Sequence, residues 1–243
     1  MEILGLQKLT LLDFPDHLAA IVFLGGCNFR CPFCQNSSLV LTPQALPAVS
    51  REEFSAFLKK RSGILDGICV TGGEPTLHRE LPEFLASIKT AGYLVKLDTN
   101  GTNPQMLEEL LRQKLVDYVA MDIKAGRTNY ARVCGLTDSA QAASLLEKIL
   151  CSVTLLQNAS IPYEFRTTAV KGLHTMEDFE DIRTWLSGCP NYYLQSFRDC
   201  PEVLLPNHPF SSFSETELQE ILACLQETIP QARLRDPLAG QDA

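Results

Sequence analysis

The stretch Leu18–Asn36 reads LAAIVFLGGCNFRCPFCQN and joins an apolar run to three closely spaced cysteines. The run Ala19–Leu24 is typical of a fully buried β-strand. Cys27, Cys31 and Cys34 follow it directly in a CxxxCxxC pattern. Three thiolates at this spacing can each bind one iron of a [4Fe–4S] cubane and leave the fourth iron open to a ligand that is not protein. The stretch therefore predicts a cluster loop at the end of a buried strand.

A structural zinc site is the alternative, because thiolates bind zinc as well as iron. A closed zinc site needs four ligands, and no fourth Cys or His stands near the triplet in the sequence. The fourth ligand would be a distant cysteine such as Cys69 or Cys200. A binding module with a structural or electron-carrying role therefore stays open beside an enzyme.

The composition is that of an ordinary globular protein with an acidic balance. The 243 residues are 45% hydrophobic and 21% charged, and the net charge is -8. Binding nucleic-acid phosphates needs a surplus of Lys and Arg, so nucleic acid is not expected as a partner. Neither a signal peptide at Met1–Lys8 nor a run of about 18 apolar residues is present. We therefore expect a cytoplasmic protein with no membrane partner, and its odd number of cysteines does not suggest a disulfide framework.

Apolar runs alternate with segments of helical period along the chain. Six runs predict β-strands, at Ala19–Leu24, Gly67–Thr71, Leu94–Thr99, Tyr118–Ile123, Tyr163–Val170 and Tyr192–Phe197. Capping boxes, in which a Ser is followed three residues later by a Glu, predict helix starts at Ser50 and Ser214. We expect a single domain over residues 1–243, with irregular structure at Gln35–Ala48, at Arg127–Asp138 and in the tail from about residue 233.

Strands separated by helices predict parallel pairing through right-handed crossovers. Polar residues then stand at or just after the carboxyl ends of the first four predicted strands, namely the cysteine loop, Gly72-Gly73-Glu74-Pro75, Asp98-Thr99-Asn100-Gly101, and Asp122 with Lys124. Arg166 and Gln195 lie within the last two predicted strands. Barrel enzymes place their sites at this end of many strands, whereas a doubly wound sheet concentrates its site at one switch point. The predicted fold class is therefore α/β, in the form of a partial (β/α)6 TIM-like barrel.

The motifs after the second, third and fourth predicted strands also have interpretations that need no ligand. Gly72-Gly73 can form an ordinary turn between a strand and a helix, and Asn100-Gly101 can form a turn beside a helix cap. Asp122 and Lys124 can form an ion pair at a strand end. Each motif alone therefore leaves both interpretations open.

The last two predicted strands carry polar residues whose roles are also open. A buried Arg166 needs an anionic partner, which either a salt bridge near Glu164 or a ligand carboxylate can supply. Gln195 can contact an adenine or ribose, or can simply end its strand. Three histidines show no metal-ligand spacing and are expected to be surface or cap residues, namely His78, His174 and His208.

The CxxxCxxC run, with Phe33 before its last cysteine, resembles the signature of radical S-adenosylmethionine (SAM) enzymes. In that family the open iron binds the amino and carboxylate groups of SAM, and reductive cleavage of SAM yields a 5′-deoxyadenosyl radical. Gly72-Gly73-Glu74 resembles the family's GGE motif, which contacts the methionine amino group. The resemblance implies one [4Fe–4S] cluster, held by Cys27, Cys31 and Cys34, and SAM as cofactors.

Asp98-Thr99-Asn100-Gly101 and the Asp-x-Lys pattern of Asp122 and Lys124 resemble motifs of the glycyl-radical-enzyme activases. In those activases the motifs border the ribose and carboxylate of SAM and can hold a monovalent cation. With these motifs, the candidate cofactor-binding residues are Phe33, Gly72, Gly73, Glu74, Asp98, Asn100, Asp122, Lys124, Arg166 and Gln195.

The opening Leu6–Pro15 resembles that of anaerobic ribonucleoside-triphosphate reductase activating proteins. This resemblance implies an oxidoreductase that cleaves SAM reductively and generates a glycyl radical on a partner enzyme. Flavodoxin or ferredoxin is the implied electron donor. Two enzymatic alternatives remain: activation of pyruvate formate-lyase or another glycyl-radical enzyme, and a reaction on a small molecule, as in the deazapurine-forming radical enzymes.

Overall fold

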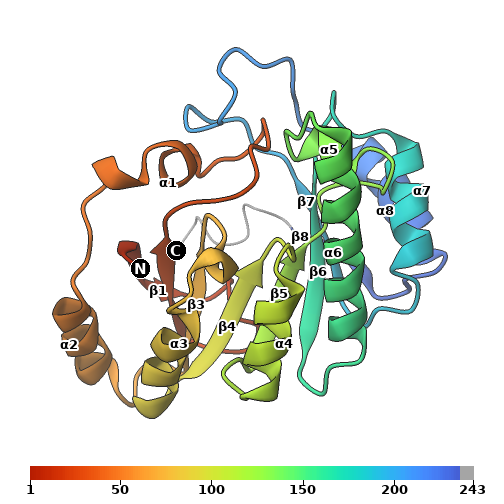
Figure 1. The fold of residues 1–243 in the computed structure, drawn as a ribbon. Helices are drawn as coiled ribbons and strands as arrows, with labels where there is room; N and C mark the ends of the chain where they lie inside the picture. Colours follow the sequence, from red (N-terminus) through yellow and green to blue (C-terminus); the bar gives the residue numbers. More distant parts are fainter. Residues whose placement is uncertain (236–243) are drawn as a thin grey trace. The chain divides into compact units, whose positions relative to one another are not determined.

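Strands and helices alternate through residues 1–235, which the computed structural model describes (Figure 1). The order of the strands in the sheet follows their order along the chain. The chain divides into two units: the first holds Met1–Asn28, Asn36–Ala120 and Ala159–Pro162, and the second holds Phe29–Gln35, Met121–Asn158 and the chain from Tyr163 onward. Whether these units form the predicted single domain stays a prediction.

The first unit contains the amino-terminal strands and the helices that connect them. Its strands are β1 (Ile3–Thr10), β2 (Ala19–Leu24), β3 (Gly67–Gly72), β4 (Leu94–Thr99) and most of β5 (Tyr118–Asp122). Its helices are α1 (Ser37–Leu41), η1 (Pro43–Ala45), α2 (Arg51–Arg61), η2 (Pro75–Leu77), α3 (Leu81–Thr90) and α4 (Pro104–Arg112). Strands β2, β3 and β4 pair in parallel, as predicted, whereas β1 pairs antiparallel to β2.

The second unit repeats the strand-helix alternation. Its elements are α5 (Tyr130–Val133), α6 (Ser139–Gln157), β6 (Tyr163–Ala169), α7 (Met176–Trp185), β7 (Tyr192–Ser196), α8 (Glu215–Gln226) and β8 (Ala232–Arg235). Strands β6, β7 and β8 are parallel neighbours. Helices α7 and α8 pack against each other (Figure 1).

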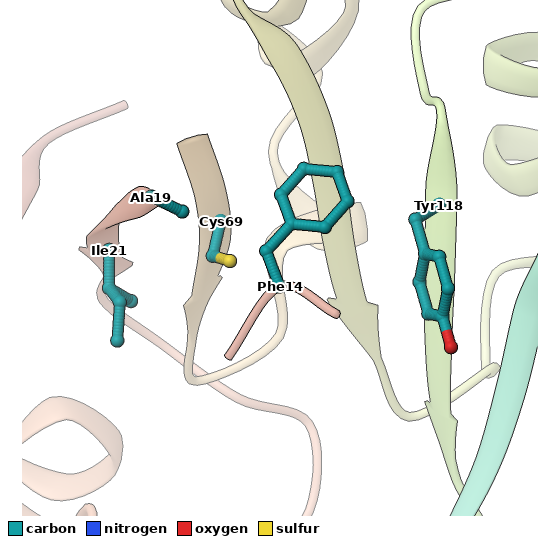
Figure 2. Packing of buried hydrophobic residues seen from close by; sticks show 5 residues of the cluster. All are labelled: Phe14, Ala19, Ile21, Cys69 and Tyr118. Carbon is teal, nitrogen blue, oxygen red and sulfur yellow. The ribbon is translucent and has the colours of Figure 1, made fainter. Parts of the chain in front are cut away.

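A compact apolar cluster anchors the strand that leads into the cysteine loop. Phe14, from the turn between β1 and β2, packs with Ala19 and Ile21 of β2, Cys69 of β3 and Tyr118 of β5 (Figure 2). The Cys69 thiol donates a hydrogen bond to the Asp13 carbonyl at 3.4 Å. Because this cysteine lies in the core, its burial is explained by packing alone.

Capping fixes where the predicted helices begin. Ser50 and Glu53 form the predicted capping box of α2, and Ser214 and Glu217 form that of α8. In each box, two backbone N–H groups that the helix leaves unpaired find side-chain acceptors. The helix starts read from the sequence are thereby confirmed. Among the described residues, none of the helices combines the length and apolar character needed to cross a bilayer.

The structure corrects the sequence-based prediction at several elements. Strand β1 was not predicted, because Gly5, Gln7 and Lys8 interrupt its apolar pattern. In the structure its register shifts twice against β2. Strand β8 extends into the tail predicted to be irregular; it has only four residues, and pairing with β7 stabilises it. Residues 236–243 lie outside the described part of the chain. Short helices α1 and α5 lie inside the two segments predicted to be irregular.

Candidate active site around the cysteine loop

Backbone hydrogen bonds within the second unit hold the cysteine loop. The amide of Arg30 donates to the Cys134 carbonyl at 3.0 Å, and the amide of Cys34 donates to the Cys31 carbonyl at 3.0 Å. The carbonyl of Cys34 accepts from Leu204 at 2.9 Å. These hydrogen bonds fix the loop backbone at Arg30, Cys31 and Cys34.

The Cys31 thiol lies in an environment that favours the thiolate. It is buried, and its pKa is lowered chiefly by a hydrogen bond from the Cys134 thiol. Burial raises this pKa, and the positive charge of Lys124 lowers it. Since the thiolate is the metal-binding form of cysteine, this side chain is ready to ligate a soft metal. Cys134 was not singled out from the sequence.

The polar residues predicted after β5 and in β6 come together in the second unit as an ion-pair chain. The Asp122 carboxylate accepts from Lys124 Nζ at 3.1 Å and from Arg166 Nε at 2.9 Å. Burial raises the pKa of Asp122, but the charges of Arg166 and Lys124 outweigh burial and hold it at about 2. The fully buried Glu164 continues the chain, with Arg235 bonded to both of its oxygens at 3.0 Å. Arg166 therefore has the anionic partners that the sequence required.

Gly72 and Gly73 leave no room for a side chain, because backbone atoms of the first unit pass close to both. A Cβ on Gly72 would lie 2.1 Å from the Leu24 carbonyl oxygen, and one on Gly73 would lie 1.9 Å from that of Gly26. Gly72 also has a φ of +127°, in the region that favours glycine. The close approach here is to the chain's own backbone, so these glycines set the position of the residue that follows them.

Glu74 is a fully enclosed hydrogen-bond acceptor in the first unit, with 1% of its surface exposed. Its Oε1 accepts from the amide of Thr76 at 3.1 Å, from the Thr76 hydroxyl, and from the Thr99 hydroxyl at 2.7 Å. Its Oε2 accepts from the amide of Asn100 at 2.6 Å. Burial raises the pKa of Glu74, and these hydrogen bonds oppose the rise. The carboxylate thus ties the turn after β3 to the turn after β4.

Asn100 carries this network to the start of the cysteine loop. Its Nδ2 donates to Asn28 Oδ1 at 2.9 Å and lies 3.9 Å from the Cys27 sulfur. Its Oδ1 accepts from the amide of Thr102 at 3.0 Å, and Asn28 in turn donates to the Thr102 hydroxyl at 2.9 Å. The first unit therefore brings Glu74, Asn100 and Cys27 together through hydrogen bonds.

The three remaining predicted residues are Asp98, Phe33 and Gln195. Asp98 pairs with the buried Lys96 of the same strand. The Phe33 ring is buried against His174, with ring centroids 6.3 Å apart. Gln195 is partly buried in β7, where it is paired with Thr168 and Arg235 on the neighbouring strands.

The histidines expected at the surface behave differently from one another. His174 is buried with 5% of its surface exposed, which corrects the prediction for this residue. Its Nδ1 accepts from the amide of Val170 at 3.0 Å, so Nε2 carries the proton and donates to the Lys124 carbonyl at 2.7 Å. His78 contacts the Gly25 carbonyl at 2.9 Å, beside the cysteine loop.

We expect stability to fall as the pH drops below about 6.5, the ordinary histidine pKa. The pKa of His174 is lowered, chiefly by burial and also by the positive charge of Arg132. Hydrogen bonds with Lys124 and Val170 and the negative charge of Asp178 raise the pKa, but they do not offset the effect of burial. The unfolded chain then binds more protons than the folded chain below the ordinary pKa, so stability is full above it and is lost as the pH falls. The slope is at most about 1.4 kcal/mol per pH unit.

Urea unfolding of wild-type protein and of the His174→Gln variant, measured across this range, checks the prediction. The variant is expected to be less stable at neutral pH but to show a flatter pH profile. If the free energy of unfolding changed with pH in the same way for both proteins, the titrating group would be one other than His174.

Two residues of this site, Lys96 and Cys134, were missed in the sequence, and Lys96 left a readable signal. Lys96 and Asp98 stand at i and i+2 on one strand, so the pair shares a face. Cys134 leaves no such signal, because only the folding of the chain brings it to Cys31.

Within residues 1–235, no three His, Cys, Asp or Glu side chains gather closely enough to hold a single metal ion. This finding includes the three cysteines of the loop.

Comparison with known proteins supplies the family. Residues 21–186 match the family described as the radical SAM superfamily. A Methanocaldococcus jannaschii protein with the provisional name glycyl-radical enzyme activating enzyme is 35% identical over 222 residues, which are 89% of this chain and 88% of that protein. The 7-carboxy-7-deazaguanine synthase of Aquifex aeolicus is 36% identical over 86 residues, which are 35% of this chain and 36% of that enzyme.

A solved structure agrees with the fold. A radical SAM methyltransferase from Sphaerobacter thermophilus matches with a TM-score of 0.69 over 94% of this chain and 68% of that chain. At 17% identity this match bears on the fold alone, and it confirms the predicted fold class. The chain therefore belongs to the radical SAM superfamily, whose enzymes use a [4Fe–4S] cluster and SAM.

Proposed function

We propose that this protein is a glycyl-radical enzyme activating enzyme and that its partner is an anaerobic ribonucleoside-triphosphate reductase. In the proposed reaction, one electron and one SAM are consumed and a glycine of the partner loses its α-hydrogen. Methionine, 5′-deoxyadenosine and a glycyl radical on the partner are the products. A low-potential flavodoxin or ferredoxin supplies the electron.

The observation that carries this proposal is the extent of the likeness to the M. jannaschii protein. It covers 89% of this chain and 88% of that protein. The likeness to the deazaguanine synthase covers only 35% of this chain. A shared substrate class is better supported by a likeness along the whole chain than by one confined to a third of it.

The loop residues fit an iron–sulfur cluster. Cys31 has a lowered thiol pKa, which favours the thiolate that iron needs. Hydrogen bonds to cluster sulfurs are a known means by which proteins adjust such clusters, and Asn100 Nδ2 lies 3.9 Å from the Cys27 sulfur. Cys27, Cys31 and Cys34 would hold the cluster, and when bound, the cluster and SAM supply the one-electron chemistry.

The chain's own residues have positioning and electrostatic tasks. The ion-pair chain of the second unit has three positive charges and two negative charges, and the surplus favours a carboxylate such as that of SAM. Its members are Asp122, Lys124, Arg166, Glu164 and Arg235. We propose that the other predicted cofactor-binding residues border SAM when it is bound. These residues are Phe33, Gly72, Gly73, Glu74, Asp98, Asn100 and Gln195. Arg30 is exposed on the cysteine loop, where it can attract an acidic electron donor.

Deuterium transfer tests the function most directly. The full chain is reconstituted with iron and sulfide without oxygen, reduced, and mixed with SAM and a reductase carrying α-deuterated glycine. We expect one deuterium in the released 5′-deoxyadenosine and a radical signal on the reductase by electron paramagnetic resonance.

Two controls define the result. Omitting the reductant should abolish both signals, and a reductase whose radical-bearing glycine is replaced by Ala should give undeuterated product only. The proposal would be overturned if no glycyl-radical enzyme transferred deuterium to 5′-deoxyadenosine while a deuterated small molecule did.

A further inference from the structure

Lys96 is a charged residue in an otherwise apolar stretch of strand β4. Its surface is 1% exposed, and its neighbours Val95 and Leu97 are fully buried. The ammonium group forms an ion pair with Asp98 and lies 5.9 Å from the centre of the Tyr118 ring. A buried ammonium without a counter-charge is strongly unfavourable, so this pair is built into the interior of the first unit.

The pairing gives Asp98 a fixed positive partner. Residues at i and i+2 of a strand project from the same face, so the backbone of β4 alone brings Lys96 and Asp98 together. The Asp98 side chain is 13% exposed against 1% for Lys96. The ammonium therefore lies deeper than the carboxylate.

Asp122 is the second carboxylate that the activase motifs would offer to a cation, and its negative charge is also already balanced by positive side chains. Within its own unit, Asp122 is bonded to Lys124 Nζ at 3.1 Å and to Arg166 Nε at 2.9 Å. A monovalent cation is attracted to a carboxylate in proportion to its uncompensated negative charge. Neither residue fits the part of a cation ligand as it stands.

A cation at Asp98 would place a second positive charge beside the buried ammonium of Lys96, and two like charges at this distance repel each other. It would also have to share the Asp98 carboxylate with a charge that is covalently held in place.

We propose that the Lys96 ammonium takes the place of the monovalent cation at Asp98, so that SAM binds without a requirement for Na⁺ or K⁺. The inference rests on the proposed function, since it concerns the same SAM site. It assigns Lys96 as a positioning residue that holds Asp98 beside the ligand.

The test measures the SAM dissociation constant of the cluster-loaded protein by equilibrium dialysis. Chloride salts of choline, Na⁺ and K⁺ are compared at one ionic strength. For wild-type protein we expect less than about a twofold difference among the three salts. For Lys96→Met, we expect about tenfold weaker binding in choline and recovery of affinity in Na⁺ or K⁺. Lys60→Met, which removes an exposed lysine of α2, is the matched control and should behave as wild type.

The wild-type salt series keeps the inference testable even if Lys96→Met does not fold. Affinity that improves about tenfold when choline is replaced by Na⁺ or K⁺ would overturn it. So would a folded Lys96→Met protein with full affinity in every salt. A wild-type protein that binds no SAM in any salt would instead overturn the proposed function, and this inference with it.

Discussion

Cys31→Ala protein should retain no cluster after anaerobic reconstitution, whereas Cys134→Ala protein should retain it in full. Cys31 belongs to the CxxxCxxC run, and its loss leaves two thiols on the loop. Cys134 lies beside it but, on the open-iron hypothesis, only donates a hydrogen bond to its sulfur. Iron analysis should give about four irons per chain for wild type and Cys134→Ala, and background for Cys31→Ala.

This pair of variants separates an open cluster from a closed four-thiolate site. If Cys134 were a fourth ligand, its replacement would release metal as readily as replacement of Cys31, and SAM would find no free coordination position. Cys151→Ala, at an exposed position of α6, controls for the loss of any thiol. A Cys134→Ala protein without iron would contradict the open site, and SAM cleavage should vanish only in Cys31→Ala.

Most of the fold was predictable because its signals are local. Strand β2 is an unbroken apolar run because both of its faces are buried, and the helix starts at Ser50 and Ser214 are set by side chains three residues apart. Strands β1 and β8 lack such signals, since one is interrupted by polar residues and the other has only four residues. Their stability comes from pairing with β2 and β7, which no local pattern contains.

The places of the candidate residues along the strands were predictable, but their contacts were not. The motifs gave Glu74 and Asn100 as residues that follow strands and Asp122 as the end of one, and the structure has them there. The direction in which the Glu74 carboxylate points depends on Thr76, Thr99 and the Asn100 amide, which belong to two separate turns. His174 was placed at the surface because its burial depends on contacts with Val170 and Lys124.

Glu74→Ala is expected to lower the free energy of unfolding of the cluster-free protein by about 3–5 kcal/mol. Four donors lose their acceptor inside a region with almost no access to water. Each buried donor left unpaired costs about 1–3 kcal/mol, and partial rearrangement reduces the sum. Chemical denaturation measures the change, with the exposed Glu83→Ala of α3 as a control expected within about 0.5 kcal/mol of wild type.

Glu74→Gln separates a positioning role from direct binding of the SAM ammonium group. The amide keeps one acceptor oxygen for Thr76 and Thr99, but its NH₂ group cannot accept from the Asn100 amide, so one contact is lost. If Glu74 acts by holding Asn100, SAM affinity should fall by less than about tenfold while the cluster is kept. If the carboxylate itself pairs with the ammonium group, removing its charge should weaken binding by well over about tenfold at nearly unchanged stability. Because both oxygens already accept from the chain, we expect the smaller loss, accompanied by a lower free energy of unfolding.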